Sequence, residues 1–354
     1  MSKLVLLALA LSTLPLVACG GDDGGKSDTE FKADVTKGMH DSIGLELANL
    51  KTAAEALQAA APTHRWDATT DAAAITAMKA AWKDTRVAYE HVEGATAPLF
   101  GSFDNSMDAR YDDFLDGNAG GAGSGGDPTP FDSTGITGMH AIERILFSAA
   151  IPANVTTYES HLTGYAVASF PTTDADAMTF KTGICQRLID DAGMLHDQWV
   201  TANIDIGASY QGLVALMNEQ KEKVDKASLG EEESRYSQIT LFDLRNNLAG
   251  TKAIYQNFRP WVAARTDVND QDSMIEVGFT HLEADYNADP GDSLPPVPAT
   301  WSSDTPTPTD LATPFGTLWQ SVHAAVNPGS AGSVVFEMNA VAMALGLEQF
   351  VEGQ

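Results

Sequence analysis

Hydrophobic and polar positions follow one another along most of this chain with the period of an α-helix. In the segment 71–100 the large apolar residues recur at helical spacing and form one stripe, which is typical of a helix packed in a bundle. The residues of that stripe are Ile75, Met78, Trp82, Tyr89 and Val92. The same periodicity predicts helices over 31–60, 71–100, 138–149, 174–201, 209–229, 241–264, 272–286, 313–326 and 334–351. No run of alternating polarity is long enough to favour a sheet.

The predicted helices fall into two sets of about four. We therefore predict an all-α fold of two four-helix bundles, one over about 30–203 and the other over about 206–352. The similar number of helices suggests a duplication, although the halves show no clear sequence repeat. A Gly-rich stretch over 117–126 and a segment rich in Pro, Asp, Ser and Thr over 289–309 are expected to be loops.

The start of the chain has the composition of a bacterial secretory signal. A basic residue precedes an apolar run over 4–16 that is too short to span a bilayer, and a small residue stands directly before Cys19. We predict a lipoprotein signal peptide over 1–18, lipidation of Cys19 and a flexible tether over 19–29. The protein would then face the periplasm, anchored in a membrane through Cys19, and Gly20 slightly favours the outer membrane.

Charge and cysteine content exclude several classes of protein. With 48 acidic and 21 basic residues the formal net charge is −27, which excludes nucleic acid as a partner. Such a surplus of negative charge concentrates cations near the protein surface. Two cysteines rule out a disulfide scaffold and a site of four thiolates. Cys185 lies in an apolar helical pattern, so we expect a buried thiol.

An arginine and two carboxylates share one face of the predicted helix 71–100. Arg86, Glu90 and Glu93 are spaced i, i+4 and i+7, beside the apolar stripe. Carboxylates next to a core are costly unless they have a partner. The pattern leaves open whether that partner is Arg86 or a bound cation. It also leaves open that the residues form an ordinary ion pair in solvent.

A His-x-x-Glu pattern in the predicted helix 138–149 is a candidate metal site. His140 and Glu143 are three residues apart, so both project from one face and can bind the same ion. An imidazole with a carboxylate suits zinc, iron, manganese or copper. The pattern differs from the His-Glu-x-x-His of zinc proteases. Gly138 in front of it permits close approach of backbone or ligand.

Two further acidic residues are candidates for the same site. Asp108 lies between the two helices, with Arg110 placed to orient it. Glu219 is an acid within an otherwise apolar helical turn.

Taken in order, these motifs resemble the imelysin family, and are most similar to its periplasmic iron-uptake branch of the EfeO type. The resemblance covers about residues 30–265. The motifs are Trp82…Arg86…Tyr89-Glu90-x-x-Glu93, Asp108-Ala109-Arg110, Gly138-x-His140-x-x-Glu143 and Gly230-Glu231-Glu232-x-x-Arg235-Tyr236-Ser237. Gln238 departs from the pattern, because relatives often carry His after Tyr-Ser.

The resemblance implies an all-α fold of two four-helix bundles and a metal site around the His-x-x-Glu. Carried over position by position, the implied ligands are His140, Glu143, Glu90, Glu93 and Asp108, and less surely Glu219. The ion would be a divalent or ferric metal, iron in the first place and zinc or copper as alternatives. An iron-uptake permease or a peroxidase-type protein would be the partner.

Three functions are compatible with these residues. The favoured one is a metal-binding, iron-related lipoprotein of the cell envelope acting in metal capture or uptake. The alternative is a metallopeptidase of the imelysin family, in which Glu90 or Glu93 activates water at the His-x-x-Glu site. In the third, the polar cluster is a buried ion-pair network around Arg86 and Arg110. Metal binding requires Glu90, Glu93 and Asp108 to converge on His140, whereas the network requires arginines at the centre.

Overall fold

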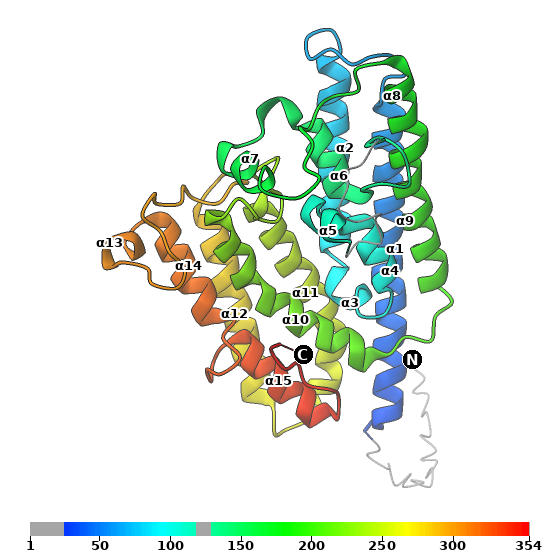
Figure 1. Ribbon diagram of the computed structural model, residues 1–354. Helices are drawn as coiled ribbons and strands as arrows, with labels where there is room; N and C mark the ends of the chain where they lie inside the picture. The colour runs from blue at the N-terminus through cyan, green and yellow to red at the C-terminus, as the bar shows by residue number, and fades with distance from the viewer. Residues whose placement is uncertain (1–24, 118–128, 354) are drawn as a thin grey trace, which may run out of the picture.

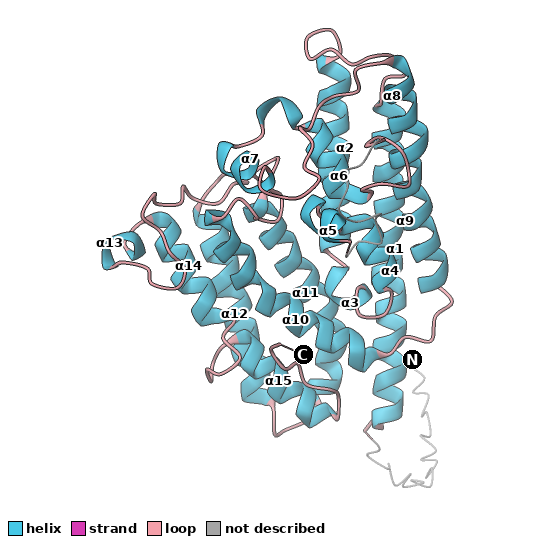
Figure 2. Cartoon of the chain, in the orientation of Figure 1, coloured by secondary structure: helices cyan, strands magenta, loops and turns pink. Residues whose placement is uncertain are grey.

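A computed structural model describes residues 25–117 and 129–353. Within these ranges the regular structure is entirely helical, which confirms the all-α prediction (Figure 2). None of the helices in the described ranges is both long and apolar enough to cross a bilayer. The predicted signal peptide, Cys19, the start of the tether and residues 118–126 of the Gly-rich loop lie outside the described residues.

The first half of the chain is built around one long helix. Its helices are α1 (Asp28–Ala60), α2 (Ala72–Glu90), α3 (Glu93–Thr96), α4 (Gly101–Asp108), α5 (Tyr111–Asp116), α6 (Gly138–Leu146), α7 (Ala153–Glu159), α8 (Asp174–Thr179) and α9 (Cys185–Trp199). A π-helical turn, Phe180–Ile184, joins α8 to α9. Helix α1 packs along both α2 and α9, while α4 and α6 lie against one another and against α9 (Figure 1).

The second half of the chain contributes a second group of helices. They are α10 (Ile206–Asp225), α11 (Thr240–Ala263), α12 (Asn269–Ala288), α13 (Pro308–Leu311), α14 (Pro314–Ala325) and α15 (Val334–Leu345), with a 3-10 turn at Lys226–Ser228 after α10. Another 3-10 turn, Ser148–Ala150, lies in the first half between α6 and α7. Helix α12 packs against α11, α14 and α15. The halves meet where α11 contacts α1 and α2, and where α10 contacts α3. We keep the division into two bundles near residue 205 as a proposal.

One apolar core runs through both groups of helices. Trp82 and Trp199 fill it in the first half and Trp261 fills it in the second, all of them buried. Cys185 is buried as predicted.

The prediction of a single helix over 71–100 is wrong. Helix α2 ends at Glu90, and the chain turns before the short helix α3. The turn brings backbone onto both α10 and α11. A Cβ atom on Gly250 would lie 2.4 Å from the Cα of His91, and one on Gly212 would lie 2.0 Å from the carbonyl oxygen of Gly94. These two glycines therefore allow the halves to meet next to Glu90 and Glu93.

The prediction of a helix over 334–351 is also too long. Helix α15 ends at Leu345, because Gly346 adopts φ +67° and its N–H bonds back to the carbonyl groups of Ala342 and Met343. The short helices α4, α5, α7 and α13 had not been predicted, since a helix of four to eight residues carries almost no periodic signal.

We predict that Gly250→Ala destabilises the protein by about 2–3 kcal/mol, because the new methyl group overlaps the backbone of His91. Urea denaturation measures the change in the free energy of unfolding. Gly101→Ala is the matched control. It lies at the exposed start of α4 with nothing within 4 Å of the added Cβ, and should change stability by less than about 1 kcal/mol. Equal effects of the two substitutions would contradict the proposed close approach.

Candidate metal site

Arg86 is the centre of the polar cluster. Its side chain is fully buried, and it forms ion pairs with four carboxylates from four segments of the chain. The partners are Glu90 one turn further along α2, Asp108 at the end of α4, Glu233 at 3.2 Å in the loop before α11 and Asp243 at 3.4 Å on α11. An arginine at the centre is what the ion-pair network hypothesis requires, so any metal must share these carboxylates with Arg86.

The start of α6 fixes the position of His140. Gly138 has φ +86°, and a Cβ atom there would lie 2.4 Å from the carbonyl oxygen of Met107. This confirms the expected close approach of backbone at Gly138. The indole N–H of Trp82 donates to the carbonyl of Met139 at 2.9 Å. Together these contacts hold His140 against the end of α4, where Asp108 lies.

Each nitrogen of the His140 ring faces a different partner. Nδ1 lies 2.9 Å from Oε2 of Glu143, while Nε2 lies 3.4 Å from Oδ1 of Asp108 and 3.5 Å from Oε1 of Glu233. The Nη1 atom of Arg86 is also 3.4 Å from Nε2. Burial and Arg86 lower the pKa of His140, but Asp108 and Glu143 outweigh them and raise it above the usual range.

Both oxygens of Glu143 are engaged by protein groups. Oε2 faces His140, and Oε1 accepts hydrogen bonds from the N–H groups of Tyr236 at 3.1 Å and Ser237 at 2.8 Å, and from the Ser237 hydroxyl at 2.7 Å. Glu143 therefore orients the imidazole and ties α6 to the loop 230–238.

Asp108, His140 and Glu233 bring three possible ligand atoms within 4.8 Å of one another. Two carboxylates and one imidazole suit a transition metal such as iron. The Nδ1 contact with Glu143 is the arrangement found behind metal-binding histidines, where a carboxylate fixes the ring and leaves the other nitrogen to the metal. The residues present therefore fit a metal ion.

Glu90 and Glu93 do not converge on His140. Glu90 pairs with Arg86 and accepts a hydrogen bond from the side-chain amide of Asn247. Glu93 accepts a bond from the same amide at 2.9 Å. Both carboxylates instead stand beside Lys223, whose Nζ atom is 3.9 Å from each of them.

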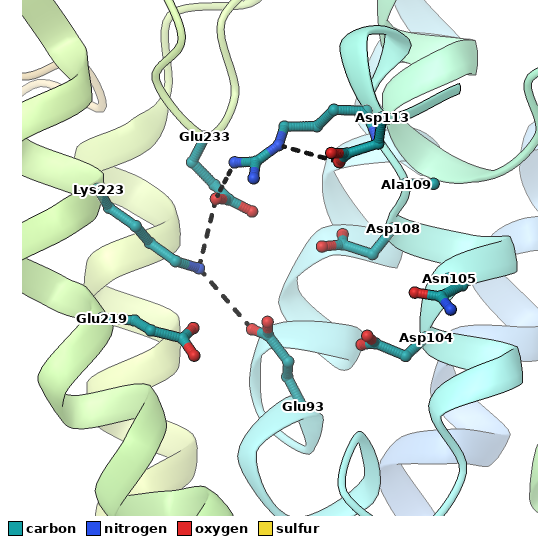
Figure 3. Close-up of a pocket in the computed structure, with 10 residues that line it drawn as sticks. Glu93, Asp104, Asn105, Asp108, Ala109, Asp113, Glu219, Lys223 and Glu233 are labelled. Atoms are coloured by element: carbon teal, nitrogen blue, oxygen red, sulfur yellow. Dashed lines mark hydrogen bonds and ion pairs between the residues drawn. The ribbon is translucent and has the colours of Figure 1, made fainter. Parts of the chain in front are cut away.

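An acidic cavity of about 250 Å³ opens next to Asp108 and Glu233 (Figure 3). Its lining consists of Glu93, Asp104, Asn105, Asp108, Ala109, Arg110, Asp113, Glu219, Lys223 and Glu233. Glu219 and Lys223 enter from α10 on one side, and Asp104 and Asp108 come from α4 on the other. Six carboxylates face only one lysine and one arginine, so the cavity attracts cations.

Three acids of the cavity wall, Glu93, Asp104 and Glu219, have raised pKa values, and burial is the main cause for each. Burial, reinforced by the charges of Asp108 and Glu93, raises the pKa of Asp104 to about 7 even though the hydroxyl of Tyr89 donates to it. The pKa of Glu219 is raised to about 7 because neighbouring protein removes part of its hydration and because Glu93 carries a like charge. Its side chain nevertheless faces the water of the cavity.

Several residues of the cluster could not be predicted from the sequence. Glu233 lies within the Gly-Glu-Glu…Arg-Tyr-Ser motif, but at a position that the resemblance left unspecified. Lys223 and Asp243 lie on helices whose periodicity marks apolar positions only, so nothing local signalled them. Gln238, the departure from the family pattern, donates to Glu232, a carboxylate that makes no ion pair with Arg86.

The fold and the motifs define a class of protein. Residues 46–297 match the family model of imelysin, peptidase family M75, and this chain belongs to the imelysin family. The family resemblance drawn from the motifs is thereby confirmed.

Part of this chain is similar in sequence to a protein of iron uptake. The iron uptake system component EfeM of Pseudomonas syringae pv. syringae is 28% identical over 188 residues, which are 53% of this chain and 50% of that protein. The chain thus matches about half the length of that relative.

Two solved structures share the fold. An imelysin-like protein from Psychrobacter arcticum has a TM-score of 0.54 at 12% identity, covering 92% of this chain and 98% of its own. A putative iron-regulated protein A precursor from Parabacteroides distasonis has a TM-score of 0.53 at 14% identity, covering 92% and 97%.

We predict that Asp104→Asn changes how stability depends on pH. A raised pKa means that the folded state binds the proton of Asp104 more tightly than the unfolded chain does. Its contribution to stability is therefore full below about pH 4 and is lost as the pH rises through about 7. Because Asp104 is partly exposed, the stability of the original protein relative to the variant should fall by about 1–2 kcal/mol across this range.

Urea denaturation at a series of pH values measures this difference. In a second variant, Tyr89→Phe, the carboxyl remains but loses the hydroxyl that donates to it, so the decline should move to higher pH. A stability difference between the original protein and Asp104→Asn that stays constant with pH would contradict the raised pKa.

Proposed function

We propose that this imelysin-family protein binds a metal ion, iron in the first place, through Asp108, His140 and Glu233, and acts in metal capture or uptake at the cell envelope. The observation that carries the proposal is the convergence of these three side chains, two of which, Asp108 and Glu233, also line the acidic cavity. Zinc and copper suit the same donors.

Arg86 leaves the cluster with a surplus of negative charge. Four carboxylates contact this one guanidinium, so Arg86 cannot neutralise them alone. Lys223 and Arg110 also approach Glu233, at 3.6 and 3.5 Å, but the cavity wall adds further carboxylates. A metal ion held by Asp108, His140 and Glu233 would balance this charge.

The other candidate residues take supporting roles in this proposal. Glu143 orients His140 rather than coordinating the ion directly. Glu90 holds Arg86 in place. Glu93 and Glu219 line the cavity, where their negative charge would attract a hydrated ion on its way to the three ligands.

The relation to iron rests on similarity. The match to an iron uptake component over half of that protein's length supports a role for this chain in iron uptake. We further propose that Cys19 anchors the protein in a membrane, and that an iron-uptake permease or a peroxidase-type protein receives the ion.

We favour metal binding over peptide cleavage. A metallopeptidase needs a carboxylate that is free to activate water. The two acids considered for that task are engaged, Glu90 by Arg86 and Asn247, and Glu93 by Asn247. Cleavage of a peptide library by metal-loaded protein, lost in Glu93→Gln, would support the peptidase instead.

We predict that residues 27–354 bind about one Fe²⁺ or Zn²⁺ ion per chain in calorimetric titrations under anaerobic conditions. His140→Ala and Glu233→Gln should each weaken binding at least about tenfold, because each removes one of three protein ligands. Asp197→Asn, which removes an exposed carboxylate on α9, is the control and should leave the affinity unchanged. Saturable binding that survives both site substitutions would disprove the assignment, and the ion-pair network would remain as the explanation of the cluster.

A further inference from the structure

Lys223 is a buried cation in the wall of the acidic cavity. It lies on α10, and its side chain is 8% exposed. Its Nζ atom is 3.6 Å from Oε2 of Glu233 and 3.9 Å from carboxylate oxygens of Glu90 and Glu93. Asn247 accepts a hydrogen bond from it at 3.1 Å. Figure 3 shows the ammonium reaching from α10 toward Glu93 and Glu233.

The position of this ammonium conflicts with metal binding at Glu233. A carboxylate that coordinates a metal gives up negative charge to it, and two cations on one carboxylate repel each other strongly in a partly buried site. Arg86 cannot relieve the conflict, because it is completely buried and held by Glu90 and Asp243 as well. Lys223 can relieve the conflict by moving, because its long and flexible side chain borders the cavity.

Glu219 offers the ammonium a second position. It precedes Lys223 by four residues, so the two side chains lie on the same face of α10. Both line the cavity, and the Glu219 side chain faces its water.

We propose that Lys223 is an internal counter-cation that occupies the place of the metal's charge when no metal is bound, and that an incoming ion drives its ammonium toward Glu219. The inference rests on the proposed function. It deepens that function, because it makes Lys223 the residue that sets how tightly the site holds its ion. Because the metal must displace this cation, the site binds its ion less tightly than the same carboxylates would without Lys223. Such moderate affinity suits a protein that captures a metal ion and then releases it.

The first test titrates Zn²⁺ alone into the original protein, Lys223→Met and Lys223→Arg. Lys223→Met removes the competing charge at similar length and should bind Zn²⁺ at least about tenfold more tightly, whereas Lys223→Arg, which keeps the charge, should stay within about threefold. An affinity of Lys223→Met equal to or weaker than that of the original protein overturns the proposal.

Glu219→Gln, combined with Lys223→Met, tests the second position. If Glu219 acts by receiving the ammonium, Glu219→Gln weakens Zn²⁺ binding in the original protein and has no effect in the Lys223→Met background. Equal weakening in both backgrounds means that Glu219 contacts the metal itself, and overturns the proposed movement of Lys223.

A measurement on the original protein avoids the risk that Lys223→Met fails to fold. Acetylation of lysines by an amine-reactive reagent, read by mass spectrometry, should rise at Lys223 at least about fivefold when Zn²⁺ is added, since movement toward the cavity exposes the ammonium. Lys37, which is 75% exposed, is the control and should react equally in both states. Unchanged protection of Lys223 in the metal-loaded protein overturns the proposal.

Different results would overturn metal binding and the role of Lys223. If the original protein binds neither Zn²⁺ nor Fe²⁺, the proposed function and this inference both fall. If it binds metal, and Lys223→Met or the acetylation pattern contradicts the expectation, only the role of Lys223 falls.

Discussion

The structure depends on one buried arginine. Arg86 lies in the core without contact with solvent, and such a charge costs several kcal/mol, about the stability of a whole domain, unless opposite charges surround it. Its four partners come from α2, the end of α4, the loop 230–238 and α11. Satisfying Arg86 therefore draws the two groups of helices together at one point, and the close contacts of Gly212 and Gly250 let their backbones meet there.

This constraint also creates the candidate metal site. More carboxylates gather around Arg86 than it can neutralise, and two of them, Asp108 and Glu233, also face Nε2 of His140. The ion-pair network and the proposed metal site would thus be two uses of the same carboxylates. Arg86 supplies the permanent positive charge, and in our proposal Lys223 supplies an exchangeable one. In the same proposal, the acidic cavity would be the route by which a hydrated cation reaches Asp108 and Glu233.

Much of the fold was predictable, because it depends on helical periodicity over long segments. The close approach of backbone at Gly138 was predictable for a different reason, since a glycine directly before a His-x-x-Glu pattern already indicates tight packing. Metal ligation by His140 stays a prediction. The turn after Glu90 could not be predicted, because it depends on contacts with Gly212 and Gly250, which are more than a hundred residues away in the sequence. That turn sends Glu93 toward Asn247 and Lys223 rather than toward His140. Glu233 and Asp243 could not be singled out either, since each becomes part of the cluster only through its distant partner Arg86.

The central claim is that a metal ion sits between Asp108, His140 and Glu233 beside a fixed Arg86. Anomalous diffraction at the iron absorption edge, from crystals of the protein loaded with iron, tests this claim most directly. We expect one strong anomalous peak within bonding distance of Nε2 of His140 and of oxygens of Asp108 and Glu233, with the Arg86–Asp243 pair intact. A map with no peak there, or with peaks only at exposed carboxylates, would contradict it and leave the cluster as a device that holds the two groups of helices together.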